Sequence, residues 1–350
     1  MRPLRGLLVL DFSTLLPGPY ASLMLAEAGA RVVKVERPGG EDTRRFPPAW
    51  GKDSAVHALL NRGKDVLRVD LKDEADRARL EPLLATCDIL IEQFRPGVMA
   101  RLGLGPEDVK RVNPDVIYCS ISGYGQTGPL AAKPDHDLGY QAATGLLALG
   151  EPMVPSALVA DIAGGSYPAV VNILLALQRR GLTGEGAVLD IAMADGCFPF
   201  ALFAQAELQA GAGVPGPGQG MLTGGLARYR VYPCADGVAI AVAALEPRFW
   251  AEVIAVTGLV VAEDEAETTR RLAAILSSRP SADWERAFAG REACVTIVRD
   301  LAGAIGHPHF VERGLFAHRV ADGRGATMPA AVVPIAPGFR ADPAIPLVAP

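Results

Sequence analysis

Short apolar runs alternate with helix-like stretches along the first third of the chain. The runs, rich in valine, leucine and isoleucine, are LLVLDF, RVVKVE, VLRVDL, CDILIEQF and VIYCSIS, and the stretches between them include GPYASLMLAEAGA and DEADRARLEPLLA. Parallel strands that are buried on both faces show continuous rather than alternating hydrophobicity. The pattern therefore predicts an α/β fold with an open parallel sheet and helical crossovers.

The middle of the chain predicts a long helix and then a domain boundary. Residues 163–180 form one apolar helical pattern that ends before Gly181 and Gly184, and VLDIAMADG adds another strand and a turn. The most glycine- and proline-rich segment, residues 211–225, is typical of a connection between two domains.

The last third predicts a smaller α+β domain. Residues 228–245 indicate two strands around an Asp236–Gly237 turn, and residues 246–256 indicate a helix. The tail from residue 323 is rich in proline, and we expect it to be extended.

Composition narrows the class of protein. Of the 350 residues, 50% are hydrophobic and 21% charged, and the net charge is −5, which indicates a folded globular protein and argues against a nucleic-acid partner. A small phosphorylated ligand is still compatible, because local arginine clusters bind one whatever the net charge. The five widely spaced cysteines form no CxxC pair, so we expect no disulfide framework, no metal site and a reducing cytoplasm.

The sequence lacks the usual signals of a redox cofactor or a membrane. No GxGxxG follows the first strand, where STLLPGPYASLMLA stands instead, so we expect neither NAD nor flavin. Asp11 interrupts the apolar N-terminus, and no later apolar stretch approaches the roughly 20 residues of a membrane span. We therefore expect a cytoplasmic protein with no membrane partner.

Three residues are candidates for catalysis, and each has a structural alternative. Asp161 precedes the predicted long helix, where it would cap the helix, or act at an anionic centre beside the first-turn amides. His136 in KPDHDLGYQ is either an exposed loop residue or, with an unperturbed pKa of about 6.5, a proton-transfer group. Glu246 is either an ordinary helix-start residue before Pro247 or a carboxylate that orients a catalytic histidine.

Four basic residues are candidates for binding a phosphate-bearing ligand, because each falls near the end of a predicted strand or in the turn after it. They are Arg37, Arg62, Lys64 and Arg95. Ligands of open α/β sheets bind beyond the carboxyl ends of the strands, and arginine makes fork-like contacts with phosphate oxygens.

Long motifs in this chain also resemble those of a known family. They are LDFSTLLPGPYASLMLAEAGARVVKVERPGGEDTR, LNRGKDVLRVDLK, FRPGVMARLGLG, SISGYGQTGP and GEGAVLDIAMADG, which cover most of residues 7–200. The chain resembles the family III coenzyme A transferases (CaiB/BaiF-like), and within them most closely the α-methylacyl-CoA racemase branch.

The resemblance implies an architecture and a ligand. It implies a large Rossmann-like, CoA-binding domain over residues 1–210, completed by about 315–350, and a small domain over 225–310. It further implies an interlocked homodimer, an acyl-CoA thioester as substrate and no cofactor beyond its CoA moiety. The candidates Arg37, Arg62 and Arg95 then become contacts for the phosphates and adenine of CoA.

The resemblance leaves two activities open. Asp161 matches the catalytic aspartate, which is an acid/base in the racemases and, in the transferases, a nucleophile that forms anhydride and thioester intermediates. The transferases move CoA between carboxylic acids, and GPGQGMLTGG with Gln219 is similar to their glycine-rich loop.

Two positions favour the racemase interpretation. DHDLGY and LEPRFW are similar to the racemase segments GHDxNY and xIEPxFY at His136 and Glu246, although Asp135 and Gly139 replace the glycine and asparagine. We therefore expect inversion of the α-carbon of a 2-methyl-branched acyl-CoA by 1,1-proton transfer through an enolate. Glu246 would orient His136, and backbone amides after Asp161 would bind the enolate oxygen.

Overall fold

The computed structural model describes residues 2–350 and divides the chain into two compact units. The large unit comprises Met1–Thr144, Pro155–Pro199 and Pro308–Pro350, and the small unit comprises Gly145–Val154 and Phe200–His307. The expected boundary at residue 210 thus lies inside the small unit.

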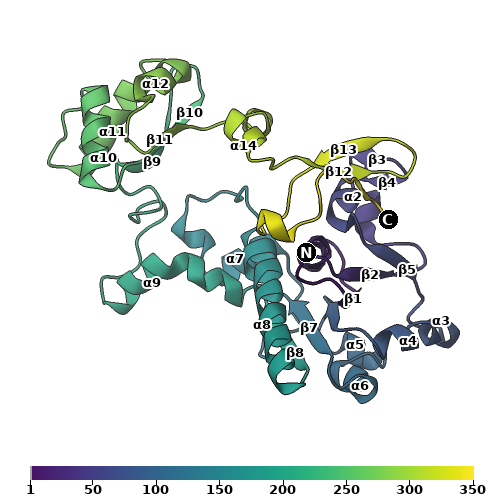
Figure 1. Cartoon of the computed structure of the whole chain (residues 1–350). Helices are drawn as coiled ribbons and strands as arrows, with labels where there is room; N and C mark the ends of the chain where they lie inside the picture. Colours follow the sequence, from purple (N-terminus) through teal and green to yellow (C-terminus); the bar gives the residue numbers. More distant parts are fainter. Residues whose placement is uncertain (1) are drawn as a thin grey trace. The chain divides into compact units, whose positions relative to one another are not determined.

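A six-stranded parallel sheet forms the centre of the large unit (Figure 1). Its strands, in spatial order, are β5 (Asp65–Arg68), β2 (Arg31–Glu36), β1 (Leu8–Asp11), β6 (Ile89–Glu92), β7 (Ile117–Ser122) and β8 (Ala187–Ala192). All six were predicted from their apolar runs, so the open parallel sheet is confirmed. Successive strands are added outward in both directions from β1 and β6, and this switch point is where open α/β sheets bind ligands.

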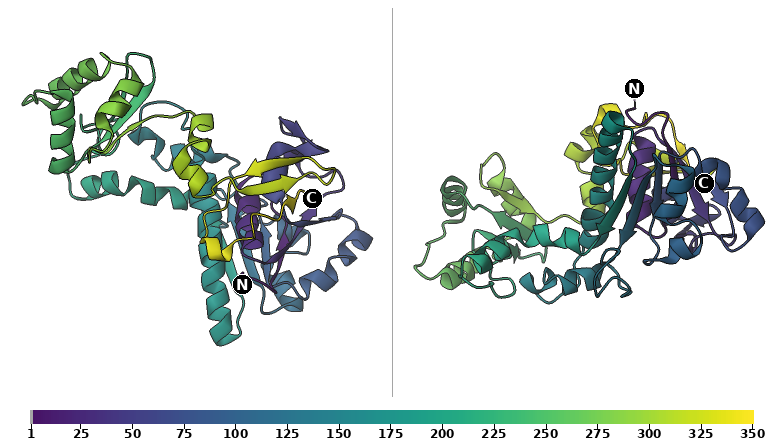
Figure 2. Two further views of the ribbon diagram at one scale, coloured as in Figure 1. Left: turned by 45° about the horizontal axis from the view of Figure 1, so that its top comes forward. Right: turned by 90° about the horizontal axis from the view of Figure 1, so that it is seen from below.

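Helices cover both faces of this sheet (Figure 2). On one face α1 (Pro17–Glu27) and α8 (Tyr167–Thr183) contact the strands. On the other, α4 (Glu81–Leu84), α5 (Val98–Arg101) and α6 (Pro106–Val112) contribute Leu84, Met99 and Val109 to the buried core. The unit also contains α2 (Ala55–Asn61), α3 (Glu74–Ala78), α7 (Asp137–Ala143), α14 (Pro308–Glu312), and a two-stranded ribbon of β3 (Ala49–Trp50) and β4 (Asp53–Ser54).

The long helix differs from its prediction at both ends. It begins as a π-helix over Val159–Ser166, continues as α8, and ends at Gly184, which has a φ of +76°. Asp161 therefore lies inside the helix, and the N-cap position belongs to Leu158. The whole of Val159–Thr183 is long and apolar enough to cross a membrane by length and composition alone, although its inner side packs on α1, β7 and β8 as in a core helix.

The small unit contains an antiparallel sheet and five helices. Its sheet has the order β11 (Val295–Ile297), β10 (Ala239–Ala243), β9 (Tyr229–Pro233). Its helices are α9 (Leu202–Gln209), α10 (Pro247–Thr257), α11 (Glu265–Leu276), α12 (Ser281–Phe288) and α13 (Leu301–Ile305). The predicted turn is confirmed, because Gly237 has a φ of +80° between β9 and β10. The core of this unit surrounds the fully buried Trp284.

The end of the chain returns to the large unit as a three-stranded sheet. Strand β12 (His318–Ala321) pairs antiparallel with β13 (Thr327–Ala330) and parallel with β14 (Leu347–Val348). Val320 and Ala330 pack on Ala58 of α2. The expectation of a merely extended tail was therefore incomplete.

Candidate active site

His136 is the N-cap residue of α7 in the large unit. Its backbone is extended, with φ −129° and ψ 175°, and its side chain makes no capping bond. The side chain is exposed, and none of the hydrogen bonds between residues 2–350 involves its imidazole. The ring is thus available to a ligand.

Asp161 is connected to the same short helix through Asp137. The backbone N–H of Asp161 donates to Asp137 Oδ1 over 2.9 Å, and Gln141 Nε2 donates to Asp137 Oδ2 over 2.6 Å. Asp137 is buried. These two hydrogen bonds hold the first turn of the π-helix beside His136. The bond from Asp161 also leaves its backbone N–H unavailable to a ligand. The amide of Ile162, which is one of the amides after Asp161 that were expected to bind an enolate oxygen, is bonded to Leu158 O over 3.2 Å. It is therefore not free for that role.

Glycine allows this π-helix to lie against the segment that follows β8. A Cβ at Gly164 would be 2.5 Å from the carbonyl oxygen of Met193, and a Cβ at Gly196 would be 2.3 Å from Gly164 Cα. Both distances are far inside van der Waals contact, so larger residues would displace the helix that carries Asp161.

The electrostatics of Asp161 suit proton transfer. Burial, followed by the negative charge of Asp137, raises the pKa of the Asp161 carboxyl to about 6, while His136 acts in the opposite direction. A carboxyl with that pKa can exist in both protonation states near neutrality, as a general acid and base requires.

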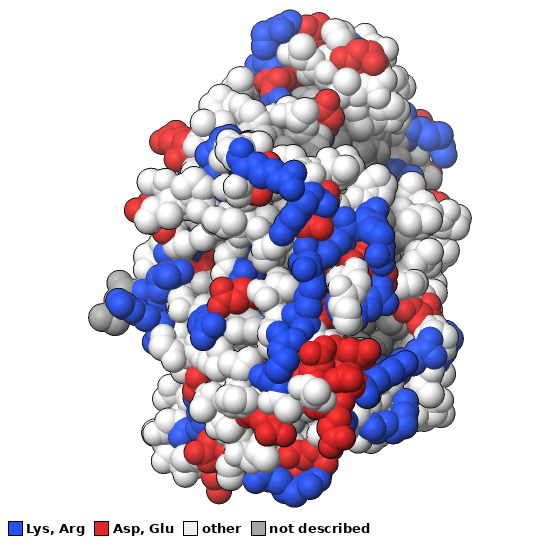
Figure 3. Space-filling model, turned by 90° about the vertical axis from the view of Figure 1, so that its right-hand side faces the viewer, with Lys and Arg blue, Asp and Glu red and all other residues white. Residues whose placement is uncertain are grey.

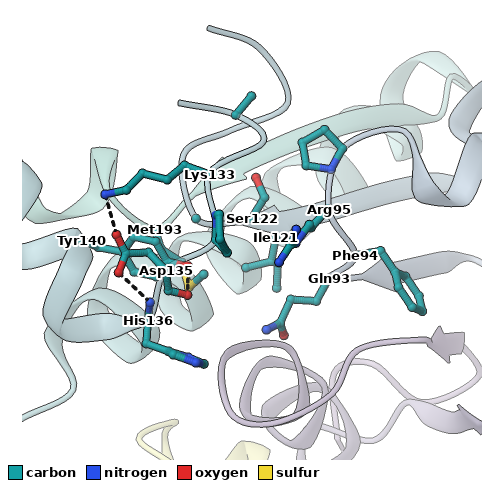
Figure 4. Close-up of a pocket in the computed structure, with 14 residues that line it drawn as sticks. Gln93, Phe94, Arg95, Ile121, Ser122, Lys133, Asp135, His136, Tyr140 and Met193 are labelled. Atoms are coloured by element: carbon teal, nitrogen blue, oxygen red, sulfur yellow. Dashed lines mark hydrogen bonds and ion pairs between the residues drawn. The ribbon is translucent and has the colours of Figure 1, made fainter. Parts of the chain in front are cut away.

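A pocket of 410 Å³ opens beside His136 (Figure 4). Its lining includes Ser122 at the end of β7, and Gln93, Arg95 and Met193, which follow β6 and β8. The imidazole points away from the Lys133–Asp135 ion pair that borders it (Figure 4). Ser122 Oγ is buried without a hydrogen-bond partner among residues 2–350.

Glu246 lies in the small unit as the N-cap residue of α10, followed by Pro247 at the first helical position. Its carboxylate is exposed and makes no capping hydrogen bond. The helix start is as expected, and the role of Glu246 in orienting His136 stays a prediction.

Arg37 lines a second pocket at the carboxyl edge of the sheet. This pocket, of 450 Å³, has apolar walls that include Val69, Phe94 and Leu102, and it also contains Lys72. Arg37 is exposed, with Nε bonded to Gly40 O over 2.8 Å and a guanidinium nitrogen to Asp42 over 2.5 Å. Phe94 lines both pockets. The two pockets are therefore neighbours within the large unit.

Arg62 and Lys64 require a correction. Arg62 is buried, donates to Glu27 Oε1 over 2.5 Å and to Ala331 O over 2.8 Å, and so ties α1 to the C-terminal segment. Lys64 is also buried, between Asp11 Oδ2 at 3.4 Å and Pro19 O at 2.9 Å, and burial lowers its pKa to about 7. Neither side chain presents a cation to solvent, so neither contacts a phosphate in this geometry.

Arg95 differs from those two buried cations. Its side chain is exposed and lines the His136 pocket, and the structure gives it no hydrogen bond or ion pair within residues 2–350. Lysine and arginine side chains also gather in a band on the face shown in Figure 3, although the net charge is −5. Basic side chains can therefore gather locally although the net charge is negative.

One buried group has metal-ligand geometry within the described part of the chain: Glu36, Glu41 and His57. Arg44 already binds both oxygens of Glu36, over 2.8 and 2.9 Å, and Lys34 lies 3.5 Å from Glu41. The protein's own cations neutralise these carboxylates, so the arrangement is an ion-pair network rather than a metal site.

Asp137, which binds the backbone amide of Asp161, was not singled out by local sequence reasoning. In the sequence it is the second aspartate of the DHD triplet. An acidic residue in the first turn of a helix is ordinary, so its type and position alone give no sign of a role. Its contact with Asp161 spans 24 residues.

Comparison with known proteins identifies the class. The chain belongs to CoA-transferase family III, whose family model matches residues 4–348. A CAIB/BAIF family protein from Brucella suis has a similar crystal structure, with a TM-score of 0.81 and 28% identity over 95% of this chain and 92% of that one.

Relatives with two activities are similar to this chain. The human alpha-methylacyl-CoA racemase is 37% identical over 327 residues, which are 89% of this chain and 82% of the relative. The acetyl-CoA:oxalate CoA-transferase of Acetobacter aceti is 43% identical over 205 residues, which are 57% of this chain and 52% of the relative. The family contains both reactions, and the chain is an enzyme of this racemase/transferase type.

Proposed function

We propose that this protein is an acyl-CoA racemase that inverts the α-carbon of a 2-methyl-branched acyl-CoA. The observation that carries the proposal is the pairing of a free imidazole, His136, with a carboxyl, Asp161, whose pKa is raised to about 6. The match to a racemase over 89% of the chain supports it.

The proposed reaction uses the acidity of a thioester. One of the two groups removes the α-proton and leaves an enolate, and the other returns a proton to the opposite face. The roles of His136 and Asp161 exchange between the two stereochemical directions. The carboxamide of Gln93, which lines the pocket beside His136, is available as a donor to the enolate oxygen. The proposed chemistry needs no metal and no redox cofactor.

The CoA moiety is proposed to occupy the pocket of Arg37, with its thioester near His136. Apolar walls suit an adenine ring, and Arg37 and Lys72 suit phosphates. The pantetheine arm would pass Phe94, which borders both pockets.

Arg37→Gln is expected to weaken binding of a CoA ester about 10- to 100-fold, because a charge-assisted contact contributes about 1.5–3 kcal/mol. Isothermal titration with a non-reactive CoA thioether measures this. Arg45→Gln is the matched control, because Arg45 is equally exposed and also contacts Asp42, over 3.0 Å, but does not line the pocket. Equal effects of the two variants would contradict this placement of CoA.

Asp137→Asn is expected to move the acid limb of kcat/KM to lower pH. The charge of Asp137 raises the pKa of Asp161, so removing that charge lowers the pKa, and Asp161 stays ionised in more acidic solution. Asparagine keeps an Oδ acceptor for the amide of Asp161. Profiles measured from pH 4 to 9 test this, with Asp195→Asn as an exposed control. An unmoved acid limb would remove Asp161 as its origin.

The decisive experiment follows one enantiomer of a 2-methylacyl-CoA by proton NMR in deuterated water, with a free carboxylic acid present. Loss of the α-proton with an intact thioester, and formation of both enantiomers, supports the racemase. Formation of the acceptor's CoA ester without exchange identifies a transferase, in which Asp161 acts as the nucleophile. That alternative is supported by the 43% identity to an acetyl-CoA:oxalate CoA-transferase over half of the chain.

We also propose that the protein is an interlocked homodimer in the cytoplasm. An exposed apolar stripe on α8 supports self-association; it consists of Tyr167, Val171, Leu174, Leu175 and Leu182, which share one helix face. Light scattering that gave the mass of one chain, 36.7 kDa, would contradict the dimer.

A further inference from the structure

The side chain of Asp135 occupies the space in which a side chain at position 139 would lie. A Cβ built on Gly139 would be 1.7 Å from Asp135 Oδ1 and 2.2 Å from its Cγ. Gly139 lies in the first turn of α7, where its N–H donates to His136 O over 2.8 Å. Its φ is not in the left-handed region. Glycine is therefore required here by Asp135 and not by the backbone.

Four hydrogen bonds fix Asp135. Oδ2 accepts from Lys133 Nζ over 2.8 Å and from the Tyr124 hydroxyl over 2.9 Å. Oδ1 accepts the backbone N–H of His136 over 3.1 Å, and the Asp135 carbonyl accepts from the Tyr140 hydroxyl over 2.8 Å. The carboxylate cannot leave position 139 without breaking several of these bonds.

The two tyrosines are themselves closely packed. Their rings meet edge to face, with centroids 5.2 Å apart, and Lys133 Nζ lies 5.4 Å from the Tyr124 centroid. A Cβ at Gly123 would be 2.5 Å from a ring carbon of Tyr140. The cluster has little room to adjust if Asp135 moves.

Within the described residues, hydrogen bonds therefore fix only the backbone of His136. Asp135 binds its N–H, Gly139 and Tyr140 bind its carbonyl over 2.8 and 3.2 Å, and its imidazole extends freely (Figure 4). We propose that Asp135 and Gly139 are a coupled pair of positioning residues that places the imidazole of His136 against the reacting carbon. The inference rests on the proposed role of His136 in proton transfer.

A double-mutant cycle tests the coupling. Gly139→Ala is expected to lower kcat about 100-fold with KM within about threefold, because displacing a catalytic group by about 1 Å costs that much. Asp135→Ala removes the three carboxylate bonds and the obstacle, and we expect about a 30-fold loss of kcat from the less ordered His136. Asp135→Ala/Gly139→Ala should match Asp135→Ala instead of multiplying the two losses. Full activity of Gly139→Ala, or multiplicative losses in the double variant, would overturn the pairing.

Histidine NMR separates this inference from the proposed function. With ¹³C-labelled histidine, the ring signal assigned by its loss in His136→Gln is expected to shift in Gly139→Ala and to have the same position in Asp135→Ala and the double variant. This readout needs no substrate, so it stands if the enzyme proves to be a transferase. An unshifted ring signal in folded Gly139→Ala, with unfolding temperature as the check on folding, would show that the pair does not position His136.

Discussion

Asp161→Asn is expected to reduce racemisation about 10³-fold, because a positioned general acid/base contributes about 10²- to 10⁴-fold. Asparagine has the same shape and preserves the backbone bonds from Asp161 N–H to Asp137 and from Ser166 Oγ to Asp161 O. It cannot accept or return the α-proton. Deuterium incorporation and enantiomeric ratio in deuterated water measure the loss, with Asp195→Asn as a folded control bearing the same substitution.

The loss of α-proton exchange, measured separately for each enantiomer, distinguishes a two-base mechanism from a one-base mechanism. In Asp161→Asn, the enantiomer whose proton faces His136 should still exchange its α-proton without inversion, while the other enantiomer should not exchange. His136→Gln should show the opposite preference. Equal loss of exchange from both enantiomers in either variant would contradict the two-base mechanism and favour a nucleophilic role for Asp161.

Arg62→Gln is expected to destabilise the protein by about 3–5 kcal/mol, because removing one partner of a buried ion pair leaves an uncompensated charge. The residue left behind, Glu27, is fully buried, with His318 Nδ1 3.3 Å away as its other partner. Denaturant unfolding measures the change in free energy. CoA-ester affinity of the folded variant should stay close to that of the unmodified protein.

Arg31→Gln is the control for that prediction. Arg31 also pairs with a carboxylate, Asp65, at 2.9 Å, but both side chains are more than half exposed. An exposed pair contributes about 0–1 kcal/mol. Similar destabilisation by the two variants would contradict the structural role of Arg62, and a large loss of CoA affinity in stable Arg62→Gln would restore it as a ligand contact.

Six parallel strands could be predicted because burial on both faces leaves a local signature. Runs such as RVVKVE and VIYCSIS need no partner to be recognised, and each is a strand of the sheet. The helix after Asp161 was predicted less well. Its first turns form a π-helix that depends on the fit of Gly164 against Met193, which no local pattern contains.

The site could be predicted as a set of residue types but not as an arrangement. Asp161 and His136 were candidates from their motifs, yet only the fold brings Asp137 to the amide of Asp161 and shows that Asp135 fills the space at Gly139. The surroundings of the basic residues also could not be predicted from the sequence. Arg37 and Arg62 look alike in the sequence, and the first lines a pocket while the second is buried against Glu27.

The sequence alone determined the strands, the family and the chemical groups available, because apolar periodicity and side-chain chemistry are properties of local stretches. The tertiary structure decided which charged side chains are exposed beside a pocket and which are paired with other charges inside the protein. Arg62 meets Glu27 and the carbonyl of Ala331 across separations of 35 and 269 residues. The energy of a charge depends on its burial and its partners, and both are defined only when distant segments pack together.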